Sequence, residues 1–378
     1  MNFSPSSALK CALVALCATV LGCGPNDGAK ELEQGKAAYE MRDLKKAEKL
    51  FEKSQSLAPQ NVERLLYLAR VKLDLGELAA AKDLVEKAVP LADGATDVTL
   101  LEAQVAWHAT DYKKAVARFS AIANDSKLDA ALRAQGWAGL GVVQMTCDEP
   151  HRARIAFLRA IRLDRRNASA WYHLGLLYRD GFGYLEAALE QFDIFVRLEE
   201  EASPRVQKVQ RTVIPALKEQ LAQAATERPG ASKRDSSACS TAIAKAEAEM
   251  KKGNFKTARQ AYQDALAADP LSYPAAFGLA RAWEKSDATK QGQTKAFENY
   301  RLACSLHPSK VSTFVTTGQL AMKLGFYAQA VEIYSRAVAA NPNSLDAIDG
   351  LIRALRKTSK ASVAKAYQEY RDLIPKRK

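Results

Sequence analysis

The sequence WYHLGLLY, residues 171–178, is followed by AALEQFDIF, residues 187–195. In the first segment, Trp171, Leu174, Gly175 and Tyr178 recur at i, i+3, i+4 and i+7, which is the period of an amphipathic helix. The small residues Gly175, in this helix, and Ala188, in the next one, would let the two helices approach closely. The second segment repeats the helical period. The pair therefore predicts two antiparallel helices joined by a short turn.

The same pattern recurs along the chain. Each unit has an alanine, usually followed four residues later by an aromatic residue, and a proline stands twelve after the alanine in four units: Pro59, Pro270, Pro308 and Pro342. The alanines are Ala47, Ala81, Ala115, Ala153, Ala188, Ala258, Ala296, Ala330 and Ala364, with spacings of 34, 34, 38, 35, 70, 38, 34 and 34 residues. A fixed period of this length indicates a stacked array of repeats.

This pattern resembles the tetratricopeptide repeat family across nearly the whole chain after the N-terminal segment. The resemblance implies an all-α, right-handed solenoid of about 8–10 stacked antiparallel helix hairpins. It also implies that the exposed residues of each first helix line an inner groove that takes another protein or a peptide. On the first helices these residues include Ser169, Tyr172, Arg179, Ser312 and Gln319.

Composition divides the chain further. We predict a first array over 29–225, a linker over 226–238 that is rich in Pro, Gly, Ser and charge, a second array over 239–372 and a basic tail over 373–378. A degenerate repeat over 203–228 closes the first array, where Pro215 should interrupt a helix. We also expect lengthened turns at 180–184 and 287–294.

The N-terminus predicts export. Residues 11–21 form an apolar run after Lys10, too short to cross a bilayer, which is typical of a signal peptide. Val20-Leu21-Gly22-Cys23 resembles the lipobox of bacterial lipoproteins, which implies removal of 1–22, lipidation of Cys23 and a tether over 23–28. The expected location is the cell envelope, at the outer rather than the inner membrane. Alternatively, an ordinary signal peptide is cut near Ala18.

The sequence lacks the motifs of catalysis. It contains no G-x-S-x-G, H-E-x-x-H or C-x-x-C, so we expect no enzyme activity, cofactor or metal. Gly139-Leu140-Gly141 lies in a helical pattern and is expected to pack rather than to bind phosphate. We interpret His173 as a partly exposed helical histidine. The thiols of Cys147, Cys239 and Cys304 are expected to be buried or partly buried and unbridged.

The net charge of +12 is uneven. Residues 201–378 carry 29 basic and 16 acidic side chains, and a cluster near the end contains Arg353, Arg356, Lys357 and Lys360. A solvated helix face explains such a cluster; binding of lipid phosphates or cell-wall polymer is the alternative hypothesis. Since an exported protein has little access to the genome, nucleic acid is not an expected partner.

Overall fold

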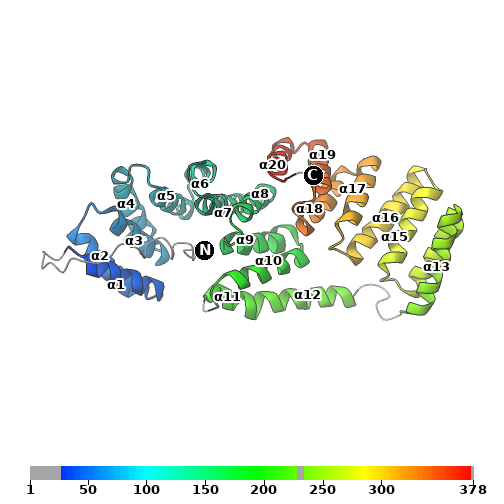
Figure 1. The fold of residues 1–378 in the computed structure, drawn as a ribbon, viewed down its shortest axis with the longest axis horizontal. Coiled ribbons are helices and arrows are strands. Elements are labelled where there is room, and N and C mark those ends of the chain that lie inside the picture. Colours follow the sequence, from blue (N-terminus) through cyan, green and yellow to red (C-terminus); the bar gives the residue numbers. More distant parts are fainter. Residues whose placement is uncertain (1–26, 202, 228–233, 376–378) are drawn as a thin grey trace. The chain divides into compact units, whose positions relative to one another are not determined.

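The computed structural model describes residues 27–201, 203–227 and 234–375. Within these ranges every regular element is a helix, and most helices follow one another in pairs (Figure 1). The described residues form two compact units that divide between His173 and Leu174.

The first unit is a run of helix hairpins. Each helix packs against the next one in the chain, from α1 through α8. Its helices are α1 (Ala29–Glu40), α2 (Leu44–Leu57), α3 (Val62–Asp74), α4 (Leu78–Ala88), α5 (Thr96–His108), α6 (Tyr112–Asn124), α7 (Ala130–Thr146), α8 (Pro150–Leu163) and the first part of α9 (Ala168–Leu176), with a short 3-10 turn at Val89–Leu91.

The second unit continues the pattern after one irregular stretch. A π-helical segment, η3 (Leu177–Phe182), ends α9, and a second one, η4 (Val209–Val213), lies between α11 (Pro204–Lys208) and α12 (Ile214–Thr226). The remaining helices are α10 (Leu185–Leu198), α13 (Ser236–Lys252), α14 (Phe255–Ala268), α15 (Tyr273–Ser286), α16 (Lys290–Leu306), α17 (Val311–Leu324), α18 (Tyr327–Ala340), α19 (Leu345–Lys357) and α20 (Ala361–Asp372).

A residue with left-handed backbone marks the turn inside nearly every hairpin. Glycine adopts this conformation without a steric penalty, and it fills half of the positions. The turn residues are Arg42, Gly76, Thr110, Asp148, Gly183, Gly253, Gly325 and Ser359. In the α15–α16 hairpin, Asp287 stands at this place with an extended backbone, at φ −145°. The turn residue provides a common register for comparing positions between repeats.

The core is built from the alanine and aromatic pattern. Phe51, Phe157, Phe192 and Tyr334 are all completely buried. Each ring rests on a glycine of a neighbouring helix: a Cβ added at Gly141, for example, would lie 2.5 Å from the ring of Phe157. Gly139 packs in the same way against Phe119, so the prediction that Gly139-Leu140-Gly141 serves helix packing is confirmed. Glycine here is a means of close helix approach.

The prolines behave as predicted. The helices α2, α14, α16 and α18 each end two residues before a proline, since the residue before proline is pushed out of the helical region. These prolines are Pro59, Pro270, Pro308 and Pro342.

Two local predictions were wrong. Residues 290–294 belong to α16 and not to a lengthened turn, because Thr289 caps that helix by accepting a hydrogen bond from the backbone N–H of Gly292 at 3.1 Å. Residues 177–182 form a π-helical segment, which takes up extra chain within the helix. Pro215 lies directly after the π-helical segment η4, which separates α11 from α12, so the regular α-helix is interrupted just before this proline, as predicted.

The predicted domain boundary stays a prediction. Residues 228–233 of the linker lie outside the described part. At its end, the guanidinium of Arg234 makes two hydrogen bonds of 2.9 Å to the carboxylate of Asp269, and the backbone N–H of Asp235 donates to the carbonyl of Ala268 at 2.8 Å. These contacts attach the start of α13 to the end of α14.

Candidate functional site

The candidate site is the exposed face of the first helices in the second unit. Six residues before each turn residue, a polar side chain points to solvent in three successive repeats. These are Arg281 on α15, Gln319 on α17 and Arg353 on α19, and all three are exposed. Gln319 was predicted to line this face, and Arg353 was predicted only as part of the basic cluster. Arg281 was missed, although the successive spacings of 38 and 34 residues along this row repeat the alanine spacings.

Two other predicted binding residues lie in different surroundings. Tyr172 on α9 is half-buried, with its ring 5.1 Å from that of His173 in an edge contact. Arg179 lies in η3, where its guanidinium binds the carboxylate of Asp180 through contacts of 2.6 and 2.7 Å. Tyr172 and Arg179 belong to different compact units. Ser169 is half-buried, whereas Ser312 is exposed.

The predicted basic cluster lies around α19. Arg353, Arg356 and Lys357 are exposed on this helix, and Lys360 is the residue before α20. The ammonium of Lys357 stands 6.0 Å from the centre of the Tyr327 ring. The cluster is therefore solvated and available to a ligand. The tail residues 376–378 lie outside the described part.

Aromatic side chains support the first-helix face near its middle. The Tyr273 hydroxyl lies 2.8 Å from the Thr313 hydroxyl, which joins the starts of α15 and α17. The Tyr300 hydroxyl donates to the carboxylate of Glu284 at 2.9 Å. Burial, reinforced by that carboxylate, raises the pKa of Tyr300 well above its usual range. The two bonds hold neighbouring helices in position.

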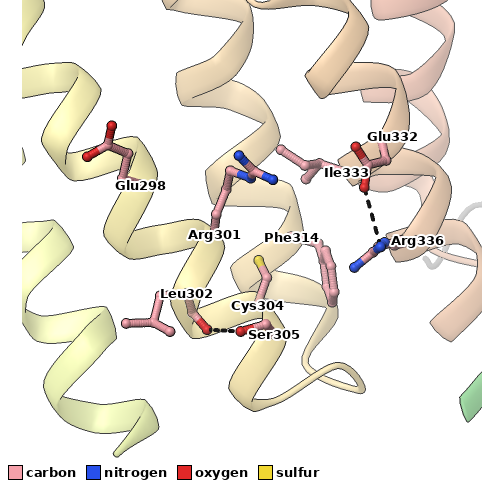
Figure 2. A pocket seen from close by; sticks show the side chains of 9 residues that line it. All are labelled: Glu298, Arg301, Leu302, Cys304, Ser305, Phe314, Glu332, Ile333 and Arg336. Atoms are coloured by element: carbon pink, nitrogen blue, oxygen red, sulfur yellow. Dashed lines mark hydrogen bonds and ion pairs between the residues drawn. The ribbon is translucent and has the colours of Figure 1, made fainter. Parts of the chain in front are cut away.

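A separate cavity of about 340 Å³ lies among α16, α17 and α18. Figure 2 shows Arg301 and Arg336 on opposite sides of it, with Phe314 and the Cys304 thiol between them. Arg336 is paired with Glu332 at 3.3 Å. Burial raises the pKa of the Cys304 thiol to about 11, so this thiol is protonated at neutral pH and is a poor nucleophile. The thiol that lines this cavity is therefore not activated for nucleophilic attack.

The structure corrects two predictions about single residues. His173 is buried and not partly exposed, because its ring stacks on Phe157 of α8 with a centroid distance of 6.0 Å. Cys147 is exposed, since it lies in the turn after α7 rather than on a packed face. Cys239 and Cys304 are buried as expected, and all three thiols are free.

The described residues were also compared with the requirements of a metal site and of a membrane-spanning helix. They include no group of three His, Cys, Asp or Glu side chains placed to hold a metal ion. Among them, no helix combines the length and apolar character needed to cross a membrane. Cys23 and the segment that resembles a lipobox lie outside the described part, so the lipidation site stays a prediction.

Comparison with known proteins agrees with this architecture. Models of the tetratricopeptide repeat match residues 38–105, 243–290 and 315–377. The comparison with curated proteins found no match.

Solved structures with a similar course of helices include three bacterial proteins. PilF of Pseudomonas aeruginosa is 18% identical, over 53% of this chain and 93% of its own, with a TM-score of 0.40. A tetratricopeptide repeat protein of Thermus thermophilus is 19% identical, over 52% of this chain and 98% of its own, with a TM-score of 0.42. MamA of Desulfovibrio magneticus is 16% identical, over 48% of this chain and 99% of its own, with a TM-score of 0.36. These likenesses carry no argument about function. On the evidence of the family models and of its paired, regularly spaced helices, the chain carries tetratricopeptide repeats over residues 38–105, 243–290 and 315–377.

Proposed function

We propose that this protein is a membrane-tethered scaffold of the bacterial cell envelope that binds another protein on the first helices of its repeats. Tetratricopeptide repeats generally mediate protein–protein interactions. The observation that carries the proposal is the row of exposed polar side chains on successive first helices: Arg281, Gln319 and Arg353. Such a row offers an extended surface to a peptide rather than a closed pocket to a small molecule.

The tether rests on the sequence around Cys23. A lipid on this cysteine would hold the repeats at a membrane, and we expect the outer membrane. Cys23→Ser should abolish labelling of the protein by a radioactive fatty acid in bacterial cells. Continued labelling of that variant would contradict lipidation at this residue.

A photo-crosslinking experiment tests the scaffold. A photoreactive amino acid in place of Gln319 on α17 should capture a reproducible partner in intact cells. The same substitution at Gln263, which is exposed on the second helix α14, serves as the matched control and should capture far less. Absence of a reproducible partner at Gln319, or equal capture at both positions, would contradict binding on the first helices.

The second candidate function is polyanion binding by the last repeat. It is favoured by the exposure of Arg353, Arg356, Lys357 and Lys360 within one hairpin. Binding to vesicles that contain phosphatidylglycerol should then fall steeply with salt, because exposed charges are screened within about 8–10 Å. Replacing Arg356 and Lys360 with glutamine should weaken it. Salt-independent binding would rule this function out.

A further inference from the structure

The second unit carries a row of lysines in one register position. In every regular repeat of this unit, the first helix ends with a lysine at the same place. This lysine stands two residues before the turn residue of its hairpin. The residues are Lys251, Lys285, Lys323 and Lys357, on α13, α15, α17 and α19. Because repeats stack with a constant relation to their neighbours, equal register positions form a line along the array. We call this line the lysine row.

The ammonium groups of the lysine row are available. All four side chains are exposed, and no carboxylate of the described residues lies within 4.0 Å of any of them. The neighbouring Lys252 differs, since it forms an ion pair with Glu249 at 2.8 Å. The structure thus leaves the row uncompensated while it pairs the adjacent lysine.

Helix capping alone does not explain the row. A basic residue in the last turn of a helix stabilises it by interaction with the helix dipole. If the fold needed this charge, the first unit would also have it. The same position there holds Glu40, Asp74, His108 and Thr146. The repeats therefore fold without a lysine at this position, and the row is a feature of the second unit.

Two further rows run beside it on the same helix face. Residues four positions earlier are polar and exposed: Glu247, Arg281, Gln319 and Arg353. Residues eight positions earlier are half-buried and apolar in three repeats: Ile243, Phe277 and Val315. Positions i, i+4 and i+8 share one face of a helix. The face is thus apolar along one side and cationic along the other.

The apolar row ends at the last repeat. Its fourth position is Asp349, which binds the guanidinium of Arg371 at 2.8 Å and is neutralised by it. The only other acidic side chain in the three rows is Glu247, against six basic ones. The face therefore carries a clear positive excess beside its apolar strip.

We infer that this face binds an acidic segment of a partner protein, held in an extended form with its apolar side chains on the Ile243–Phe277–Val315 strip. This inference rests on the proposed scaffold function and specifies the chemistry of the partner. The first helices α13 and α15 pack directly against each other, as do α17 and α19. Directly packed helices lie about 8–10 Å apart, and an extended chain rises about 3.3 Å per residue. An acidic residue at about every third position would therefore meet the lysines of two first helices that pack directly.

The first test uses a defined probe. A fluorescent 15-residue peptide with glutamate at every third position and leucine between them is titrated against the purified full-length protein by anisotropy. A peptide of the same design with lysine in place of glutamate is the ligand control. The acidic peptide should bind and the basic one should not. Equal binding of both peptides would overturn the role of charge.

The second test compares two triple variants of equal charge. The row variant carries Lys285→Gln, Lys323→Gln and Lys357→Gln. Each exposed ion pair contributes modestly, so the loss of three should weaken acidic-peptide binding by about tenfold or more.

The charge-matched control carries Lys256→Gln, Lys290→Gln and Lys365→Gln on the second helices α14, α16 and α20, where the replaced side chains are also exposed. Its affinity should change less than about threefold, because exposed ion pairs act only locally. Circular dichroism of both variants confirms that the repeats are folded. Equal weakening in both variants would mean that net charge alone attracts the peptide, and the inference would fall. Tighter, row-dependent binding to anionic vesicles than to the peptide would assign the face to lipid and also overturn it.

Crosslinking in cells separates this inference from the scaffold proposal. With the photoreactive residue at position 319, the row variant should lose the captured partner and the control variant should keep it. If the row variant captures the same partner equally well, the scaffold stands and the lysine row is not its binding site. If the otherwise unchanged protein captures no partner, the scaffold proposal itself fails.

Discussion

Replacing Gly350 with alanine is expected to destabilise the second unit, because the added methyl group would meet the buried ring of Tyr334. Tyr334 on α18 is completely buried between α17 and α19. A Cβ at Gly350 would lie 2.1 Å from the Cε1 atom of this ring, where ordinary contacts begin at about 3.4 Å. The ring cannot move away toward α17, because Gly318 on that helix already packs closely against it. A Cβ added at Gly318 would lie 2.5 Å from the ring.

The size of the effect is a difference between two opposing contributions. Alanine favours a helix over glycine by about 0.8–1 kcal/mol. Overpacking of a filled core typically costs about 1–3 kcal/mol, and the overlap at Gly350 is severe. We therefore expect Gly350→Ala to lower the free energy of unfolding by about 1–2 kcal/mol.

Urea unfolding followed by circular dichroism at 222 nm measures this change. Because repeat arrays can unfold in parts, hydrogen exchange of α17–α20 should report the same loss locally. The matched background is Tyr334→Leu, which removes the ring. In that background Gly350→Ala should become neutral or stabilising. The reasoning is refuted if Gly350→Ala is neutral or stabilising while Tyr334 is present.

Two further predictions concern paired side chains. Lys72→Met removes the ammonium that lies 2.6 Å from Glu48, which should lower the free energy of unfolding at pH 7 by about 1–3 kcal/mol. The hydrogen bond from Lys72 holds the pKa of Glu48 below its usual value of 4.5. The loss of unfolding free energy relative to wild type, measured by urea unfolding, should therefore be full above pH 4.5 and shrink as the pH falls through the lowered pKa. A loss that stays constant with pH would contradict this cause. Trp283→Leu removes a ring whose centre lies 3.8 Å from the Arg259 guanidinium and 4.7 Å from the Lys295 ammonium. The loss of each cation–π contact should lower the free energy of unfolding by about 0.5–1 kcal/mol. Thermal unfolding should show the loss, and it should shrink in an Arg259→Met, Lys295→Met background.

Several parts of the fold could be predicted because they depend on residues close in the chain. The 34-residue spacing of alanines located the hairpins, and the prolines located the ends of α2, α14, α16 and α18. The helix-packing role of Gly139 and Gly141 also followed from the local pattern. These features rest on helical periodicity and on steric preferences of single residues.

The site was only partly predictable. Gln319 was placed on the exposed face of a first helix and Arg353 in a basic cluster, but Arg281 was missed. Arg179 was expected to line the groove, whereas Asp180 pairs with it. The exposure of a side chain and its pairing are set by neighbours that the repeat period does not specify.

The sequence by itself determined that this chain is a helical repeat array, because the period of its small and aromatic residues admits only stacked hairpins. Only the tertiary structure decided that residues 290–294 extend a helix, that η3 is a π-helical segment and that His173 is buried against Phe157. It also showed that the lysine row is exposed and has no carboxylate partner among the described residues, whereas Lys72 is paired with Glu48. Each of these outcomes depends on contacts with another helix or on the geometry of a turn, and such contacts exist only once the hairpins have packed.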